Sequence, residues 1–281
     1  MADIAKAYVQ IVPSAQGISG KISQALGGEA ERAGKAGGGK FSSAFGAALK
    51  VGGAAIAAGA AALGKVASEA ISGYADYEQL VGGVETLFAD SADVVQQYAS
   101  NAFKTAGLSA NEYMETVTSF SASLLQSLGG DTAKAAQVGD MAISDMADNA
   151  NKMGSSMESI QNAYQGFAKQ NYTMLDNLKL GYGGTKTEME RLLADASKLS
   201  GVEYNIDSLS DVYEAIHVVQ EEMGITGTTA KEAYETISGS LATTKAAWSN
   251  LLVGIADENA DFPALINNFV ESASEIGRAH V

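Results

Sequence analysis

Hydrophobic residues recur at helical spacing along most of the chain beyond residue 72. The clearest case follows a capping box at residues 109–112, after which one apolar stripe consists of Tyr113, Val117, Phe120, Leu124 and Leu128. A second capping box at residues 185–188 opens another amphipathic segment, and Ser208 with Asp211 opens a third. These patterns predict an all-α chain, a helical bundle or extended helices.

A longer helix is predicted to begin at residues 229–232 and to continue past residue 250. Its apolar positions are separated by 4, 3, 4, 3 and 4 residues, and they are Ile237, Leu241, Thr244, Trp248, Leu251 and Ile255. A heptad-like seam of this kind predicts packing against partner helices. Asp261 and Pro263 then supply the N-cap and the first-turn proline of a last helix through Phe269.

The N-terminal residues have a different pattern. Residues 6–13 alternate between apolar and polar side chains and end at a proline, which predicts a short extended strand or arm. The glycine-rich residues 34–39 are typical of a flexible linker. We therefore assign residues 1–40 to an N-terminal arm and linker.

Residues 41–72 form a second segment, which is almost entirely small and apolar. Small faces that would let helices approach closely are offered by Gly52, Gly53, Gly59 and Gly64. The segment is either a soluble, self-associating helix or a membrane-active one, and the pattern leaves both interpretations open. Residues 73–270 are then the main helical domain.

Composition excludes several kinds of chemistry. The 281 residues include no cysteine and two histidines, so we expect no disulfide, no thiolate metal site, no catalytic triad and no cofactor. The net charge of −15 disfavours specific binding to nucleic acid, because an acidic surface repels phosphate. Residues 59–66 have P-loop spacing, but Val66 stands where the magnesium-binding hydroxyl belongs, so nucleotide binding is not expected.

The remaining polar candidates have structural interpretations. His217 with Glu221 one turn later is interpreted as a pair on a helix surface, and Asp140, Asp145 and Asp148 as residues of a solvated helical face rather than a glycosidase site. No catalytic residues are therefore expected. Four methionines are either adaptable core packing or a forgiving contact surface, namely Met141, Met146, Met153 and Met157.

One long stretch carries a resemblance. Residues 164–185, Tyr-Gln-Gly-Phe-Ala-Lys-Gln-Asn-Tyr-Thr-Met-Leu-Asp-Asn-Leu-Lys-Leu-Gly-Tyr-Gly-Gly-Thr, resemble a signature of tail tape measure proteins from long-tailed bacteriophages of Gram-positive hosts. Residues 188–195, 224–229, 236–240 and 245–251 are similar to the same family. We call the most distinctive part the motif turn, which comprises Met174, Leu175, Asp176, Leu178, Gly181, Tyr182, Gly183 and Gly184. Its glycines also predict a tight turn between helices.

The resemblance implies a structural role in the phage tail. Such proteins are multi-copy, largely helical chains inside the phage tail, and tail-tube subunits polymerise around them until the chain is spanned. The implied partners are the tail-tube protein, tail assembly chaperones, tail-tip proteins and other copies of the chain. The implied locations are the host cytoplasm during assembly, the tail lumen, and the host membrane when the chain leaves to help DNA enter. The alternative is a membrane-disrupting helical protein or a small tail component that sets no length.

The last residues are unusual. Residues 275–281 look like the translation of a sequencing-library adapter, so we expect them to be foreign to the fold. On this interpretation the chain is the N-terminal fragment of a longer protein.

Overall fold

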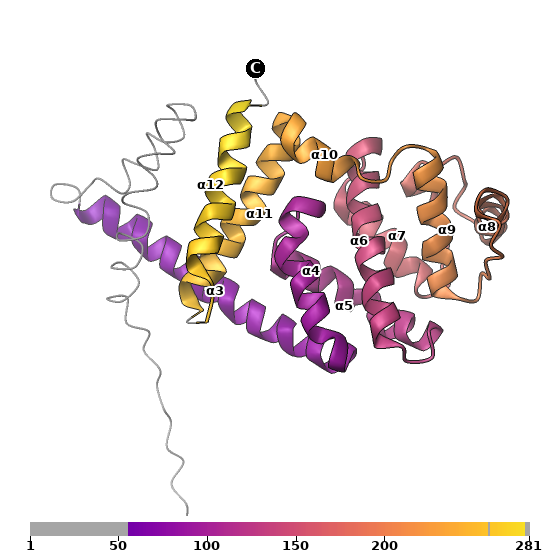
Figure 1. The fold of residues 1–281 in the computed structure, drawn as a ribbon, viewed down its shortest axis with the longest axis horizontal. Coiled ribbons are helices and arrows are strands. Elements are labelled where there is room, and N and C mark those ends of the chain that lie inside the picture. Colours follow the sequence, from indigo (N-terminus) through magenta and orange to yellow (C-terminus); the bar gives the residue numbers. More distant parts are fainter. Residues whose placement is uncertain (1–55, 258, 279–281) are drawn as a thin grey trace, which may run out of the picture. The chain divides into compact units, whose positions relative to one another are not determined.

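The computed structural model describes residues 56–257 and 259–278, and within these ranges the regular elements are all helices (Figure 1). The all-α prediction is confirmed for these residues. The chain divides into two units, Met1–Glu69 and Ala70–Val281, and the second is described by itself. The predicted arm and linker, together with Gly52 and Gly53, lie outside the described residues, whereas Gly59 and Gly64 lie in helix α3.

The described helices follow one another with connections that are short, except for the longer one at residues 168–185. They are α3 (Ile56–Phe88), α4 (Ala92–Thr105), α5 (Ala110–Ser127), α6 (Thr132–Met153), α7 (Met157–Phe167), α8 (Lys186–Ser200), α9 (Leu209–Glu222), α10 (Thr228–Glu235), α11 (Ile237–Ala256) and α12 (Phe262–Arg278). Two short 3-10 turns intervene, η1 (Ala89–Ser91) and η2 (Leu175–Leu178). None of the helices in this described part combines the length and the apolar character needed to span a membrane.

The predicted helix starts are largely confirmed. At α5, the Glu112 amide donates to Ser109 Oγ and the Ser109 amide donates to Glu112 Oε2, which completes the capping box. At α8 only half of the box forms. The amide of Glu188 donates to Thr185 Oγ1 at 3.2 Å, but the Glu188 carboxylate accepts from Gly183 instead.

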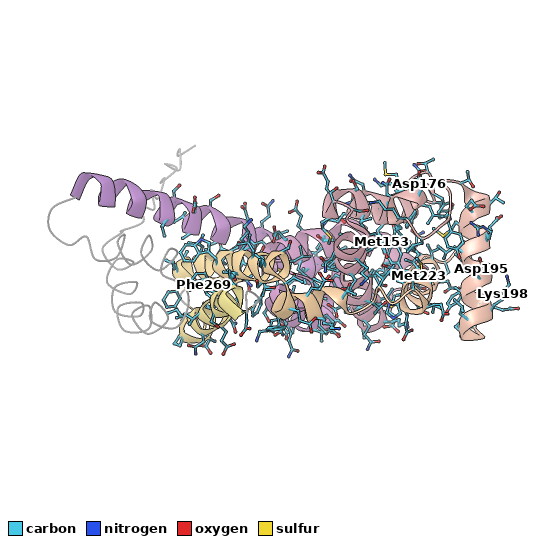
Figure 2. All side chains as sticks on the ribbon, turned by 90° about the horizontal axis from the view of Figure 1, so that it is seen from above. Met153, Asp176, Asp195, Lys198, Met223 and Phe269 are labelled. Atoms are coloured by element: carbon cyan, nitrogen blue, oxygen red, sulfur yellow. The ribbon has the colours of Figure 1, made fainter. Side chains whose placement is uncertain are left out.

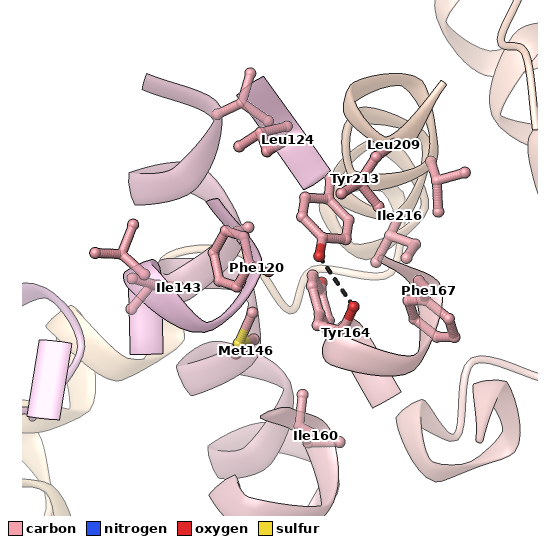
Figure 3. Packing of buried hydrophobic residues seen from close by; sticks show 14 of the residues in the cluster. Phe120, Leu124, Ile143, Met146, Ile160, Tyr164, Phe167, Leu209, Tyr213 and Ile216 are labelled. Carbon is pink, nitrogen blue, oxygen red and sulfur yellow. Dashed lines mark hydrogen bonds between the residues drawn. The ribbon is translucent and has the colours of Figure 1, made fainter. Parts of the chain in front are cut away.

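The core lies among α3 to α9, and Figure 3 shows the part of it around Tyr213. Tyr213 stands at its centre, with its ring centroid 5.5 Å from that of Phe120 and 5.0 Å from that of Tyr164. Its hydroxyl donates to the carbonyl oxygen of Tyr164 at 3.0 Å, so the buried polar atom is satisfied. The predicted stripe of α5 faces this core, with Leu124 fully buried and Leu128 half-buried. We call residues 84–222, which contribute nearly all of this apolar cluster, the body.

The helix predicted to be continuous from residue 229 to residue 255 is broken at Thr236, so that prediction is wrong. Thr236 is extended, ends α10 and begins α11 by accepting a hydrogen bond from the Gly239 amide at 3.0 Å. Gly239 permits the close approach of the two helices at this break, because a side chain there would collide with the backbone of Glu232. We call α10, α11 and α12 the C-terminal arm.

The predicted seam divides along its length. Leu251 is buried, and Trp248 and Ile255 are half-buried, with Trp248 packing on Phe269 of α12 at 5.2 Å between ring centroids. By contrast, Ile237 and Leu241 are exposed. Much of the buried face of α11 consists of small and polar side chains, which are Ser240, Thr243, Thr244, Ala246, Ala247 and Asn250.

The last helix begins as predicted and runs further. The Ala264 amide donates to Asp261 Oδ1 at 3.2 Å, which makes Asp261 a helix cap. Helix α12 continues to Arg278, so residues 275–278 take helical conformation with the residues before them.

Candidate functional site

The motif turn is anchored by buried leucines. It lies in the connection between α7 and α8, where Leu175 and Leu178 are completely buried in the core and Leu180 nearly so. Tyr172, just before it, stacks on Phe167 with ring centroids 6.0 Å apart. The connection is therefore held by apolar packing along its length, although it contains only one turn of 3-10 helix.

Helix α6 and the residues just after it hold the same connection by hydrogen bonds. The side-chain amide of Asn149 donates to the carbonyl oxygen of Leu178 at 3.0 Å, and Ser155 Oγ donates to that of Asn177 at 3.2 Å. Lys179 Nζ donates to the carbonyl oxygen of Met153 at 2.9 Å, in the last turn of α6. A cation in this place satisfies a carbonyl that has no partner within the helix.

Two of the three glycines of the motif turn, Gly181 and Gly184, are required by backbone geometry. Gly181 has φ +86°, in the left-handed region, and a side chain on Gly184 would collide with the carbonyl oxygen of Thr173. Gly183 donates its amide to the Glu188 carboxylate at 3.0 Å. The prediction of a tight turn between helices is confirmed.

A charged cluster covers the solvent side of this turn. The Arg191 guanidinium lies over the ring of Tyr182 at 4.3 Å from its centroid, and donates to the carbonyl oxygen of Gly181 and to Glu188. The Tyr182 hydroxyl donates to Asp195 Oδ2 at 3.1 Å. The hydrogen bond from Arg191 lowers the pKa of Glu188, whereas burial raises the pKa of Tyr182.

Exposed residues complete the surface. Met174 is 42% exposed and Asp176 is exposed beside it in sequence. Figure 2 shows Asp195 and Lys198 along α8, where they form an ion pair at 2.8 Å. The arrangement presents a fixed loop with one apolar side chain and several charges, which is suited to recognition. Within the described ranges, no group of three or more acidic or histidine side chains could hold a metal ion.

Two of the aspartates assigned to a solvated face are buried, so that prediction is wrong. The Asp145 side chain is 1% exposed, and His217 Nδ1 lies 2.9 Å and 3.0 Å from its two carboxylate oxygens. The predicted surface pair of His217 with Glu221 is therefore replaced by a contact between α9 and α6. Asp140 is half-buried and accepts from the Tyr113 hydroxyl at 2.9 Å.

The pKa values of Asp145 and His217 are both shifted in the folded protein. Burial raises the pKa of Asp145 to about 6, although the hydrogen bond from His217 acts in the opposite direction. The same hydrogen bond raises the pKa of His217. Both groups therefore bind their protons more tightly in the folded protein than in an unfolded chain.

Asp148, one turn further along α6, is bound to the arm. It is 3% exposed and accepts from the amides of Gly227 at 2.5 Å and Thr229 at 2.7 Å. These amides belong to the first turn of α10, whose own N-cap residue is a glycine without a capping side chain. The cap of α10 is thus supplied by another helix, and for that reason it could not be found by local spacing.

The methionines favour one of the two interpretations left open. Met146 is completely buried, and Met141, Met153 and Met157 are half-buried against the core. This supports core packing rather than a contact surface.

No protein-family model, no curated protein and no solved structure matches this chain.

Proposed function

We propose that the chain is a structural protein of a bacteriophage tail, a tape measure protein that templates tail-tube assembly and sets tail length. The observation that carries the proposal is the resemblance of residues 164–185 to the family signature. In this chain the stretch forms a loop anchored in the core, and charged residues of α8 cover its solvent side, which would suit recognition of tail proteins. The location proposed is the tail lumen, after assembly in the host cytoplasm, with a role in DNA passage afterwards.

Two parts of the described chain would serve this role differently. Helix α3 has 33 residues and, at about 1.5 Å per residue, advances about 50 Å. The helices from α4 onward pack against one another, so their residues add little length. We propose that the part of α3 that precedes the body belongs to the measuring part, and that the body and arm bind the tail-tube, chaperone and tip proteins. The acidic charge would keep such a chain from adhering to DNA in the same tube.

The proposal is tested in the phage or prophage that encodes the chain. Deleting its gene is expected to abolish tails of uniform length, measured by electron microscopy of purified particles. Tails of unchanged length and number would overturn the proposal.

A length series tests the division of labour. An insertion of four heptads into α3 near Gly64 is expected to lengthen the tail by about 42 Å, because each residue adds about 1.5 Å. The matched control places the same number of residues in the connection at residues 201–207, between α8 and α9, and should leave tail length unchanged. If the two variants had tails of equal length, α3 would not be part of the segment that sets tail length.

A further inference from the structure

The contact between the arm and the body has a polar composition. Asp148 of α6 accepts the amides of Gly227 and Thr229, and this bond attaches the first turn of α10 to the body. A second bond of the same type runs the other way. Asn250 Oδ1 of α11 accepts the amide of Ala110 at 2.8 Å, at the first turn of α5. Each region therefore caps a helix of the other.

The surface around these caps contains little large apolar side-chain area. The apolar core cluster ends at Ile225 and contains no residue of α10, α11 or α12. Ser240 and Thr244 face inward, but their hydroxyls donate to carbonyl oxygens one turn earlier in their own helix. These hydroxyls need no partner on the body, so their separation from it breaks no hydrogen bond.

The arm has packing of its own. Trp248 of α11 lies against Phe269 of α12, and Leu265 of α12 packs at Gly254 of α11. The two helices make the most extensive helix–helix contact in the described part of the chain. The arm can therefore keep its internal contacts when it leaves the body.

The connection into the arm has the geometry of a hinge. Gly224 and Gly227 have φ of +64° and +79°, in the region where glycine is favoured, and they flank the buried Ile225. The carboxylate of Asp148, freed from two main-chain amides, would regain water as the arm moved away. That hydration offsets part of the cost of breaking its two hydrogen bonds.

We infer that the arm opens from the body as one cooperative unit, pivoting at residues 224–227, while the body stays folded. The opening is a local transition of lower free energy than global unfolding. The caps at Asp148 and Asn250 act as two latches that hold the closed state, together with an exposed hydrogen bond of 3.0 Å from Asn151 Nδ2 of α6 to Glu232 Oε2 of α10. The inference concerns the fold alone and does not depend on the proposed function.

Hydrogen–deuterium exchange with mass spectrometry, on the full chain under native conditions, measures the opening. Peptides of α10, α11 and α12 are expected to exchange with one shared rate, at least tenfold faster than peptides of α5, α6 and α9. Asp148→Ala should accelerate the arm peptides about tenfold further, since losing a helix cap costs roughly one such factor. Body peptides should keep their rates.

A control variant and a variant of the second latch accompany this experiment. Asp140→Ala removes a carboxylate from the same helix whose bond goes to Tyr113 of the body, so it should not accelerate the arm selectively. Asn250→Ala should act on the arm as Asp148→Ala does. Arm peptides protected as well as body peptides in the wild type would overturn the inference, as would equal acceleration of arm and body by both latch variants.

A reversible lock gives an independent measurement. The chain has no cysteine, and a Cβ placed on Gly107 of the body would lie 3.6 Å from Cβ of Ala242 in α11, within disulfide range. Comparing oxidised and reduced forms of the Gly107→Cys, Ala242→Cys variant cancels the cost of the substitutions. Oxidation should slow arm exchange at least tenfold, and no difference between the two forms would contradict the hinge.

Discussion

The body and the arm are both helical, yet they are stabilised in different ways. In the body, large side chains such as Phe120, Tyr164 and Tyr213 are buried together, and their burial is a large apolar contribution. On α11 the arm buries mainly alanine, serine and threonine, and bonds to the body through caps. Helix content alone therefore does not tell which helices unfold together.

Truncating one phenylalanine in each region should change the stability of body and arm very differently. Phe120→Ala should lower the free energy of global unfolding by about 3–5 kcal/mol, because it removes a fully packed ring and leaves a cavity beside Tyr213. Phe269→Ala removes the same side chain from the arm, where it packs on Trp248. It should leave the denaturation midpoint of the body nearly unchanged.

Urea titration followed by tyrosine and tryptophan fluorescence distinguishes the two outcomes, since Trp248 is the single tryptophan and reports on the arm. Equal shifts of both signals in both variants would mean that body and arm unfold as one unit.

The next effect concerns the pH dependence of the body. The folded protein binds the Asp145 proton more tightly than the unfolded chain, so this contribution to stability is present at low pH and declines as pH rises through about 6. The His217 contribution has the same sign, and is lost as pH rises from about 6.5 through its raised pKa. Each group lowers the free energy of unfolding by at most about 1.4 kcal/mol per pH unit.

Asp145→Asn tests this sign, because asparagine resembles the protonated acid. The variant should match the wild type near pH 4 and exceed its stability at pH 8 by on the order of 1–3 kcal/mol, measured by urea denaturation. A variant less stable than the wild type at pH 8 would show that the ion pair with His217 outweighs the burial cost. Asp176→Asn, an exposed site, serves as the control.

These two regions also separate what the sequence could predict from what it could not. The stripe of α5 and the caps at Ser109 and Asp261 follow from local spacing, and they are confirmed. The burial of Asp145 and Asp148 depends on which helices pack against α6, so a single helical pattern carries no signal for it. The break at Thr236 was not predicted, because the apolar seam begins only at the next residue and gives no sign of a helix boundary before it.

The motif turn was predicted as a turn, but its anchoring was not. The burial of Leu175 and Leu178 depends on contacts with the separate helices α6 and α7. The local spacing of apolar residues therefore does not predict it. Lys179 donates to the main-chain carbonyl of Met153, and Arg191 donates to that of Gly181 in addition to its neighbour Glu188. The bonds to main-chain carbonyls leave no trace in residue spacing.

A smaller effect compares equivalent caps in the two regions. Ser109→Ala and Thr236→Ala each remove a side-chain oxygen that accepts an amide at a helix N-terminus, a loss of about 1 kcal/mol. Ser109→Ala should lower the global denaturation midpoint, whereas Thr236→Ala should only accelerate hydrogen exchange within the arm. Ser100→Ala, at an exposed serine inside α4, should change neither. If Thr236→Ala lowered the global denaturation midpoint, the arm and the body would unfold as one unit.

The smallest effect on stability concerns the exposed half of the seam. Ile237 is 46% and Leu241 is 42% exposed, so Leu241→Lys should change the free energy of unfolding by less than about 0.5 kcal/mol. The heptad-like spacing nevertheless predicts that these positions pair with another helix, and a second copy of the chain is the partner that we test. Sedimentation velocity should then show association of the wild type that Leu241→Lys weakens. Leu199→Lys, at an equally exposed leucine of α8, should not weaken it. If the wild type stays monomeric at every concentration, the exposed seam pairs no copies, and the heptad spacing of α11 reflects only the packing of Trp248 and Leu251 within the folded chain.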